Sequence, residues 1–80
     1  MTTFTQIPGS RSYIVEYNSV YYGETHYERS GGGFVWYPKN LRRDTPERRN
    51  EERRASFRTD RRALHTAIAN FLQTEQDRIL

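Results

Sequence analysis

Three residues that could carry acid–base or metal chemistry alternate along one short segment: Glu24, His26 and Glu28. At this spacing the side chains of a β-strand point to one face. Two carboxylates beside an imidazole can bind a metal ion or exchange protons with a substrate. The same pattern is more often the polar end of a strand, and no second segment supplies an obvious further ligand. We therefore predict no catalytic residue, no metal and no cofactor, and the chain is expected not to be an enzyme.

A second chemical signal is a run of arginines. Nine of the thirteen Lys and Arg residues lie between Leu41 and Arg62. Guanidinium groups bind phosphate and carboxylate through a planar fork that lysine cannot reproduce. The run is either a cationic surface that contacts nucleic acid or an acidic protein patch, or a solvated segment whose arginines pair with the interleaved acids, as at Arg48 and Glu52. The residues predicted here to contact a partner are Arg42, Arg43, Arg48, Arg49, Arg53 and Arg54.

Aromatic residues occupy the other half of the chain, where nine of the eleven precede Pro38. One short helix can cover only one face of a small sheet, so part of the aromatic set would remain exposed and could form a contact surface. Alternatively, the tyrosines only stiffen a thin sheet through cross-strand pairs. The contact residues predicted in this half are Tyr21, Tyr27, Arg29 and Trp36.

The segments that must position these residues read as strands joined by tight turns. Asn18-Ser19 predicts a two-residue hairpin, because asparagine tolerates positive φ. The Ser-Gly-Gly-Gly segment at 30–33 predicts the next turn, and Gly23 predicts a bulge or a close-packing point within its strand. β-branched and aromatic residues predict three strands, at Ser12–Tyr17, Val20–Arg29 and Phe34–Tyr37.

An unbroken register from the hairpin pairs Val15 with Tyr22. This register places Tyr21 and Tyr27 together on one face, with Val15 and Tyr22 on the other. A slip of one residue would exchange the two faces.

The C-terminal part predicts an amphipathic helix from about Asp60 to Thr74, with Thr59 as its N-cap. His65 is expected at the boundary of the apolar stripe. The stripe is predicted to pack on one face of the sheet. Its members are Ala63, Leu64, Ala67, Ile68, Phe71 and Leu72.

Together these elements predict a single α+β domain over residues 1–80. It is a three- to four-stranded antiparallel β-meander with one C-terminal amphipathic α-helix packed on one face. Ser56-Phe57-Arg58 is the candidate for the fourth strand. The parts are an N-terminal segment (1–11), the meander (12–37), an Arg-rich connector (38–55), the short strand and helix (56–74) and a tail (75–80).

Composition narrows the class of protein further. The chain has no cysteine, so a disulfide framework and a cysteine-based zinc site are excluded. It has no apolar run long enough to span a membrane, and its first ten residues lack the pattern of a signal peptide. We therefore expect a cytoplasmic protein with no membrane partner.

Two resemblances bear on function. Ser56-Phe57-Arg58-Thr59, followed by Ala63 and Leu64, resembles the strand-to-helix junction of small domains encoded by phages and mobile elements. The nearest described group is the three-stranded DNA-binding domain of AP2-type plant factors and of integrase N-termini. That resemblance implies a sheet lying in the DNA major groove, with Tyr27, Arg29 and Trp36 at the positions that contact DNA.

The second resemblance is one of format. A cysteine-free, single-domain chain of 80 residues that opens Met-Thr-Thr-Phe-Thr is similar to small phage-encoded anti-CRISPR proteins. It implies a non-enzymatic inhibitor, acting in the cytoplasm of a bacterial host, that docks on a CRISPR effector or another nucleic-acid-handling complex through Arg and aromatic residues. The alternative is a module that binds DNA directly through its sheet.

Overall fold

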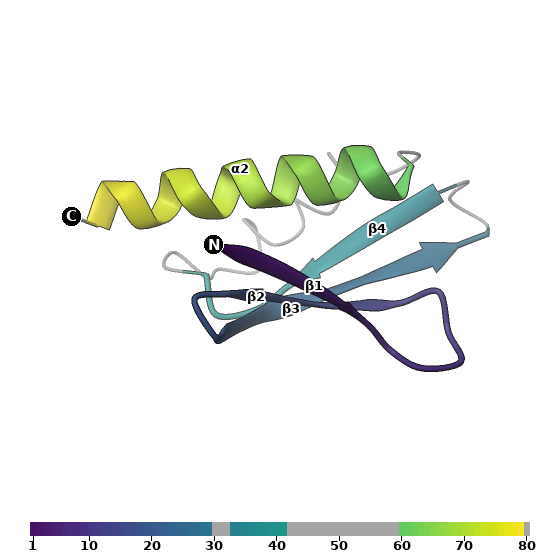
Figure 1. Cartoon of the computed structure of the whole chain (residues 1–80). Helices are drawn as coiled ribbons and strands as arrows, with labels where there is room; N and C mark the ends of the chain where they lie inside the picture. The colour runs from purple at the N-terminus through teal and green to yellow at the C-terminus, as the bar shows by residue number, and fades with distance from the viewer. Residues whose placement is uncertain (30–32, 42–59, 80) are drawn as a thin grey trace.

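In the computed structural model, the strands form one antiparallel sheet and a C-terminal helix lies across one of its faces (Figure 1). The structure describes residues 1–29, 33–41 and 60–79. The strands are neighbours in chain order, so the predicted α+β meander with one packed helix is confirmed. The elements are β1 (Thr2–Gln6), β2 (Tyr13–Tyr17), β3 (Val20–Glu28), β4 (Gly33–Pro38) and α2 (Arg61–Ile79).

The fourth strand of the sheet is β1, which the sequence did not predict. Residues 1–11 were expected to be an N-terminal segment, but Thr2–Gln6 pairs antiparallel with β2, and Phe4 lies opposite Val15. The alternation of threonine with Phe4 suits a strand that is paired on one edge only. The strand predicted at 56–58, the N-cap predicted at Thr59 and most of the connector fall outside the described residues.

The predicted hairpin at Asn18-Ser19 is confirmed. Both residues have positive φ, at 49° and 70°, and Tyr17 pairs with Val20 across the turn. Positive φ at both central positions matches the right-handed twist of the flanking strands. The turn therefore fixes the register at this end of β2 and β3.

A bulge interrupts the register two residues farther along. Glu16 pairs with Tyr21 but Val15 pairs with Gly23, so Tyr22 is the extra residue on β3 at this point. The predicted pairing of Val15 with Tyr22 is therefore wrong. The prediction that Gly23 marks a bulge or a close-packing point is confirmed, because the bulge lies directly before it and β4 approaches it closely. The extra residue moves each later side chain of β3 to the opposite face of the sheet. Tyr21, which precedes it, points away from α2, whereas Tyr27, which follows it, lies on the side of α2.

The helix α2 begins at Arg61, one residue later than the predicted start at Asp60. Asp60 is the N-cap: its Oδ1 accepts a hydrogen bond of 2.7 Å from the amide of Ala63. The helix continues to Ile79 instead of ending near Thr74. No glycine or proline follows Thr74 to stop it.

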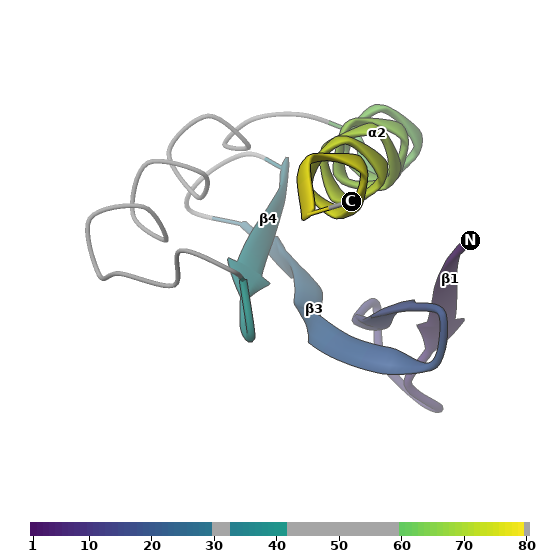
Figure 2. The ribbon, with the colours of Figure 1, turned by 90° about the vertical axis from the view of Figure 1, so that its left-hand side faces the viewer.

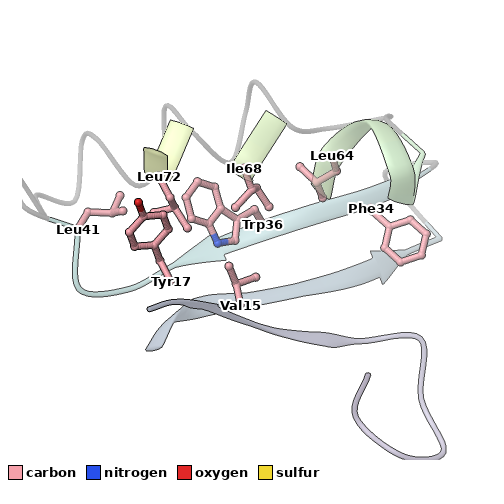
Figure 3. Packing of buried hydrophobic residues seen from close by; sticks show 8 residues of the cluster. All are labelled: Val15, Tyr17, Phe34, Trp36, Leu41, Leu64, Ile68 and Leu72. Carbon is pink, nitrogen blue, oxygen red and sulfur yellow. The ribbon is translucent and has the colours of Figure 1, made fainter. Parts of the chain in front are cut away.

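The core lies between α2 and the sheet, which curves so that both edge strands, β1 and β4, reach the helix (Figures 2 and 3). Leu64, Ile68 and Leu72 form the buried row of α2. Ala63 and Ala67, predicted to belong to the stripe, are exposed. The buried face of α2 is thus rotated toward His65. The sheet side and the loop after β4 contribute Val15, Tyr17, Phe34, Trp36 and Leu41.

Candidate binding surfaces

The side of the sheet that faces away from α2, here called the outer face, is acidic and rich in tyrosine. The strand registers place Glu24, His26 and Glu28 together on it, as the alternation predicted. No lysine or arginine lies among the described strand residues of this face. Its strand residues are Thr3, Thr5, Ile14, Glu16, Tyr21, Glu24, His26, Glu28, Val35 and Tyr37.

A chain of hydrogen bonds orders the outer face. His26 Nδ1 lies 2.7 Å from Ser12 Oγ, His26 Nε2 lies 3.0 Å from Glu24 Oε1, and the Tyr21 hydroxyl donates to Glu24 Oε2 at 2.9 Å. Since a carboxylate only accepts, Nε2 carries the proton, and in the neutral ring Nδ1 accepts from Ser12. Partial burial, and then the Glu24 carboxylate, raise the pKa of Tyr21 above its usual value. The tyrosine therefore stays protonated as a donor.

Ser12, His26 and Glu24 are hydrogen-bonded in the same sequence as a nucleophile, its general base and the carboxylate that orients the base. Acyl transfer also needs donors for the developing oxyanion. The amide of Ser12 is engaged by Ser10 Oγ at 3.1 Å, so the nucleophile's own amide is occupied. Glu28 does not join the chain, because it accepts a hydrogen bond of 2.8 Å from Tyr37. Among the described residues, no group of three or more His, Cys, Asp or Glu is placed to hold a metal ion.

A cationic and aromatic surface lies at the β3–β4 end, on the other side of the sheet. The Cζ atom of Arg11 sits 3.8 Å from the centroid of the Tyr27 ring, within the range of a cation–π contact. Tyr27 in turn meets Phe34 edge to face, with centroids 5.4 Å apart. Arg29 follows β3 directly and is exposed. These four residues, Arg11, Tyr27, Arg29 and Phe34, are called the Arg11 corner below.

The residues predicted to contact a partner do not form one surface. Tyr21 lies on the outer face and Tyr27 in the Arg11 corner, each 37% exposed. Trp36 is 1% exposed in the core, so its predicted contact with a partner is wrong. The six predicted arginines, Arg42, Arg43, Arg48, Arg49, Arg53 and Arg54, lie outside the described residues.

The position of Trp36 also bears on the resemblance to three-stranded DNA-binding domains. Tyr27 and Trp36 both lie on the side of the sheet that carries α2. The outer face presents Glu16, Glu24 and Glu28, which repel phosphate. The DNA-reading positions implied by that resemblance therefore do not form one exposed sheet surface.

A third cluster, centred on His65, was not predicted. His65 is 8% exposed. Its ring stacks on the Phe4 ring with centroids 4.0 Å apart, and it meets the Tyr13 ring edge to face with centroids 4.9 Å apart. Its Nε2 lies 2.9 Å from Thr25 Oγ1. Burial and then the charge of Arg61 lower the pKa of His65 to about 4. The only sequence signal was the position of His65 beside the row formed by Leu64, Ile68 and Leu72.

Because His65 is neutral in the fold, stability should depend on pH. Its pKa falls from 6.5 in the unfolded chain to about 4 in the fold, so between these values only the unfolded chain takes up the proton. Stability should therefore decrease as the pH falls from 6.5 to 4, by up to about 3 kcal/mol from this group. Urea unfolding across that range measures the effect.

The control for this prediction is His65→Gln, which removes the titration and keeps an amide within reach of Thr25. Other groups titrate in both proteins, so the difference between the two pH profiles isolates His65. Parallel profiles would contradict the prediction.

An open pocket adjoins the His65 cluster, between the first turns of α2 and strands β1 and β2. Its volume is about 360 Å³. The residues that line it are Phe4, Tyr13, Arg61, Arg62, His65, Thr66 and Ala69.

Comparison of the chain with protein-family models, with curated proteins and with solved structures finds no match. No helix among the described residues is long and apolar enough to cross a membrane.

Proposed function

We propose that this chain is a non-enzymatic binding protein that docks on a nucleic-acid-handling complex, such as a CRISPR effector, and inhibits it. The observation that carries the proposal is the Arg11 corner. An exposed guanidinium lies 3.8 Å from the centre of a half-exposed tyrosine ring, and Phe34 supports that ring from the core. Arginine and tyrosine are the residues that most often dominate the energy of protein interfaces. A side chain that is already ordered loses less entropy on binding.

The outer face indicates what kind of partner surface would fit. Glu24 and Glu28 each accept a hydrogen bond from a tyrosine, Tyr21 and Tyr37, so carboxylates and hydroxyls are held together on one side of the sheet. A negative surface of this kind complements a cationic one. Proteins that handle nucleic acid carry cationic surfaces to bind phosphate. The outer face could therefore oppose such a surface while the Arg11 corner contacts an acidic or polar region beside it.

The same charge distribution weakens the DNA-binding alternative. A sheet that presents three glutamates and no described lysine or arginine on its outer face gains nothing from counterion release there. Direct binding to DNA would have to rely on the Arg-rich connector instead of the sheet.

The test has two steps. The chain is first expressed in bacteria that carry one of several CRISPR systems, and phage titre is measured with and without it. Binding of the purified chain to the effector that it inhibits is then measured directly. We expect Arg11→Glu and Tyr27→Ala each to weaken binding by about tenfold or more, as for interface hot spots.

The matched control is Lys39→Glu, which makes the same change of charge at an exposed residue after β4 and should leave binding unchanged. Equal loss for Lys39→Glu would mean that only net charge matters. In parallel, the anisotropy of labelled duplex and single-stranded DNA is measured at low and physiological salt. Inhibition of no system together with salt-sensitive DNA binding would replace this proposal with the DNA-binding alternative.

A further inference from the structure

The pocket beside His65 combines flat walls with two cationic groups at its rim. Phe4, Tyr13 and the stacked His65 ring form the aromatic wall. Arg61 and Arg62, the first residues of α2, supply the charge. A volume of about 360 Å³ falls at the small end of the range of ligand pockets, about 300–1,000 Å³. The pocket is therefore large enough for a small ligand.

Among the described residues, no acid neutralises the positive charge of the pocket. In the part of the chain that the structure describes, no carboxylate forms an ion pair with Arg61 or Arg62. The nearest acid in the sequence, Asp60, caps the helix: its Oδ1 accepts a hydrogen bond of 2.7 Å from the amide of Ala63. Arg61 lies with its Cζ 5.4 Å from the Tyr13 ring centroid, a position that orders the guanidinium beside the aromatic wall.

His65 contributes an uncharged aromatic ring to the wall of the pocket. It is buried, stacked on Phe4 and bonded to Thr25, and its lowered pKa keeps the ring neutral at physiological pH. The cationic groups therefore lie at the rim only, above an uncharged aromatic wall. A ligand that fits both parts needs an anionic group with several acceptor oxygens and, beside it, a flat ring.

We propose that this pocket binds one nucleotide, with its phosphate at Arg61 and Arg62 and its base against Phe4 and Tyr13. Phosphate offers the oxygens that a guanidinium fork binds through paired hydrogen bonds. Bases stack on aromatic side chains with little dependence on sequence. The nucleotide is either free or the phosphorylated end of a single strand. This site goes beyond the proposed docking function and does not depend on it.

The test follows amide chemical shifts of the whole chain during titration with adenosine monophosphate, inorganic phosphate and adenosine. We expect the nucleotide to bind more tightly than either part, with shift changes concentrated at the pocket residues. Arg61→Gln and Arg62→Gln should each weaken nucleotide binding by about tenfold. Tyr13→Leu should weaken the nucleotide but leave the affinity for phosphate unchanged.

Lys39→Gln is the matched control, since it removes an exposed positive charge outside the pocket. Equal weakening by Lys39→Gln, or phosphate that binds as tightly as the nucleotide, would overturn the proposal. A short single strand with and without a terminal phosphate distinguishes the two sources. Preference for the phosphorylated strand over the free nucleotide assigns the pocket to strand ends, and the reverse assigns it to free nucleotides. Binding of neither overturns the site, whatever the effector assays show.

Discussion

Gly23→Ala is expected to destabilise the fold by about 3 kcal/mol or more. A Cβ atom at this position would lie 2.2 Å from the carbonyl oxygen of Tyr37, 3.0 Å from Pro38 Cα and 3.1 Å from the amide nitrogen of Lys39. All three atoms are backbone, so no side chain can rotate away and β4 itself must move. Gly23 also has φ of +119°, a conformation that costs other residues about 1–3 kcal/mol. The steric cost adds to the backbone cost.

The matched control is Gly9→Ala. Gly9 also has positive φ, at +75°, but a Cβ there would have no neighbour within 4 Å. Its cost should be about 1–2 kcal/mol, the penalty for the backbone alone. Urea unfolding of both variants separates the two contributions. If Gly23→Ala costs no more than Gly9→Ala, the close approach of β3 and β4 at this point is contradicted.

Gly23 matters for function because it directly follows the bulged residue. The bulge inserts Tyr22 as an extra residue in β3 and turns Tyr27 to the side of α2, where Arg11 covers its ring. Without the extra residue, Tyr21 and Tyr27 would share one face, as the unbroken register predicted. The separation of an acidic outer face from a cationic corner therefore depends on one local backbone irregularity.

Much of the fold follows from short-range chemistry. Asn18 tolerates positive φ, so the hairpin was predictable from the turn residues, and β2, β3 and β4 followed from β-branched and aromatic runs. β1 was harder, because Thr2–Gln6 has one large apolar residue, Phe4, and becomes a strand by pairing with β2. Such pairing is a tertiary effect that a local pattern cannot reveal.

The candidate sites depend on contacts between distant parts of the chain. Phe4 stacks on His65, and Tyr17 donates a hydrogen bond of 3.1 Å to Gln73 Oε1. Helical periodicity predicts that α2 has an apolar stripe, but it predicts only approximately which side chains of the helix face the sheet. In the observed rotation, α2 contacts both edge strands, β1 and β4, whereas the sequence pattern had placed His65 only at the boundary. The pocket could not be predicted for the same reason.

That rotation leads to the second large effect, Leu64→Ala. Leu64 is 2% exposed and lies in the buried row of α2 with Ile68 and Leu72. Removing its side chain should cost about 2–5 kcal/mol, from lost burial and the cavity that remains. Phe71→Ala should cost less, about 1–2 kcal/mol, because Phe71 is only half-buried and meets the edge of the core at Trp36, with centroids 5.6 Å apart. Urea unfolding measures both values.

Ala67→Gln distinguishes the observed rotation from the stripe predicted by sequence. Ala67 is exposed, and glutamine is a good helix former, so this change should alter stability by less than about 0.5 kcal/mol. If Ala67 instead faced the sheet, the longer polar side chain would be forced into the core at a cost of about 1–3 kcal/mol. Leu64 is buried in both orientations, so a large loss for Ala67→Gln beside the loss for Leu64→Ala would place the helix in the orientation that the stripe predicted. That orientation would also turn His65 away from Phe4 and Thr25, so Ala67→Gln also tests whether the aromatic wall of the pocket exists.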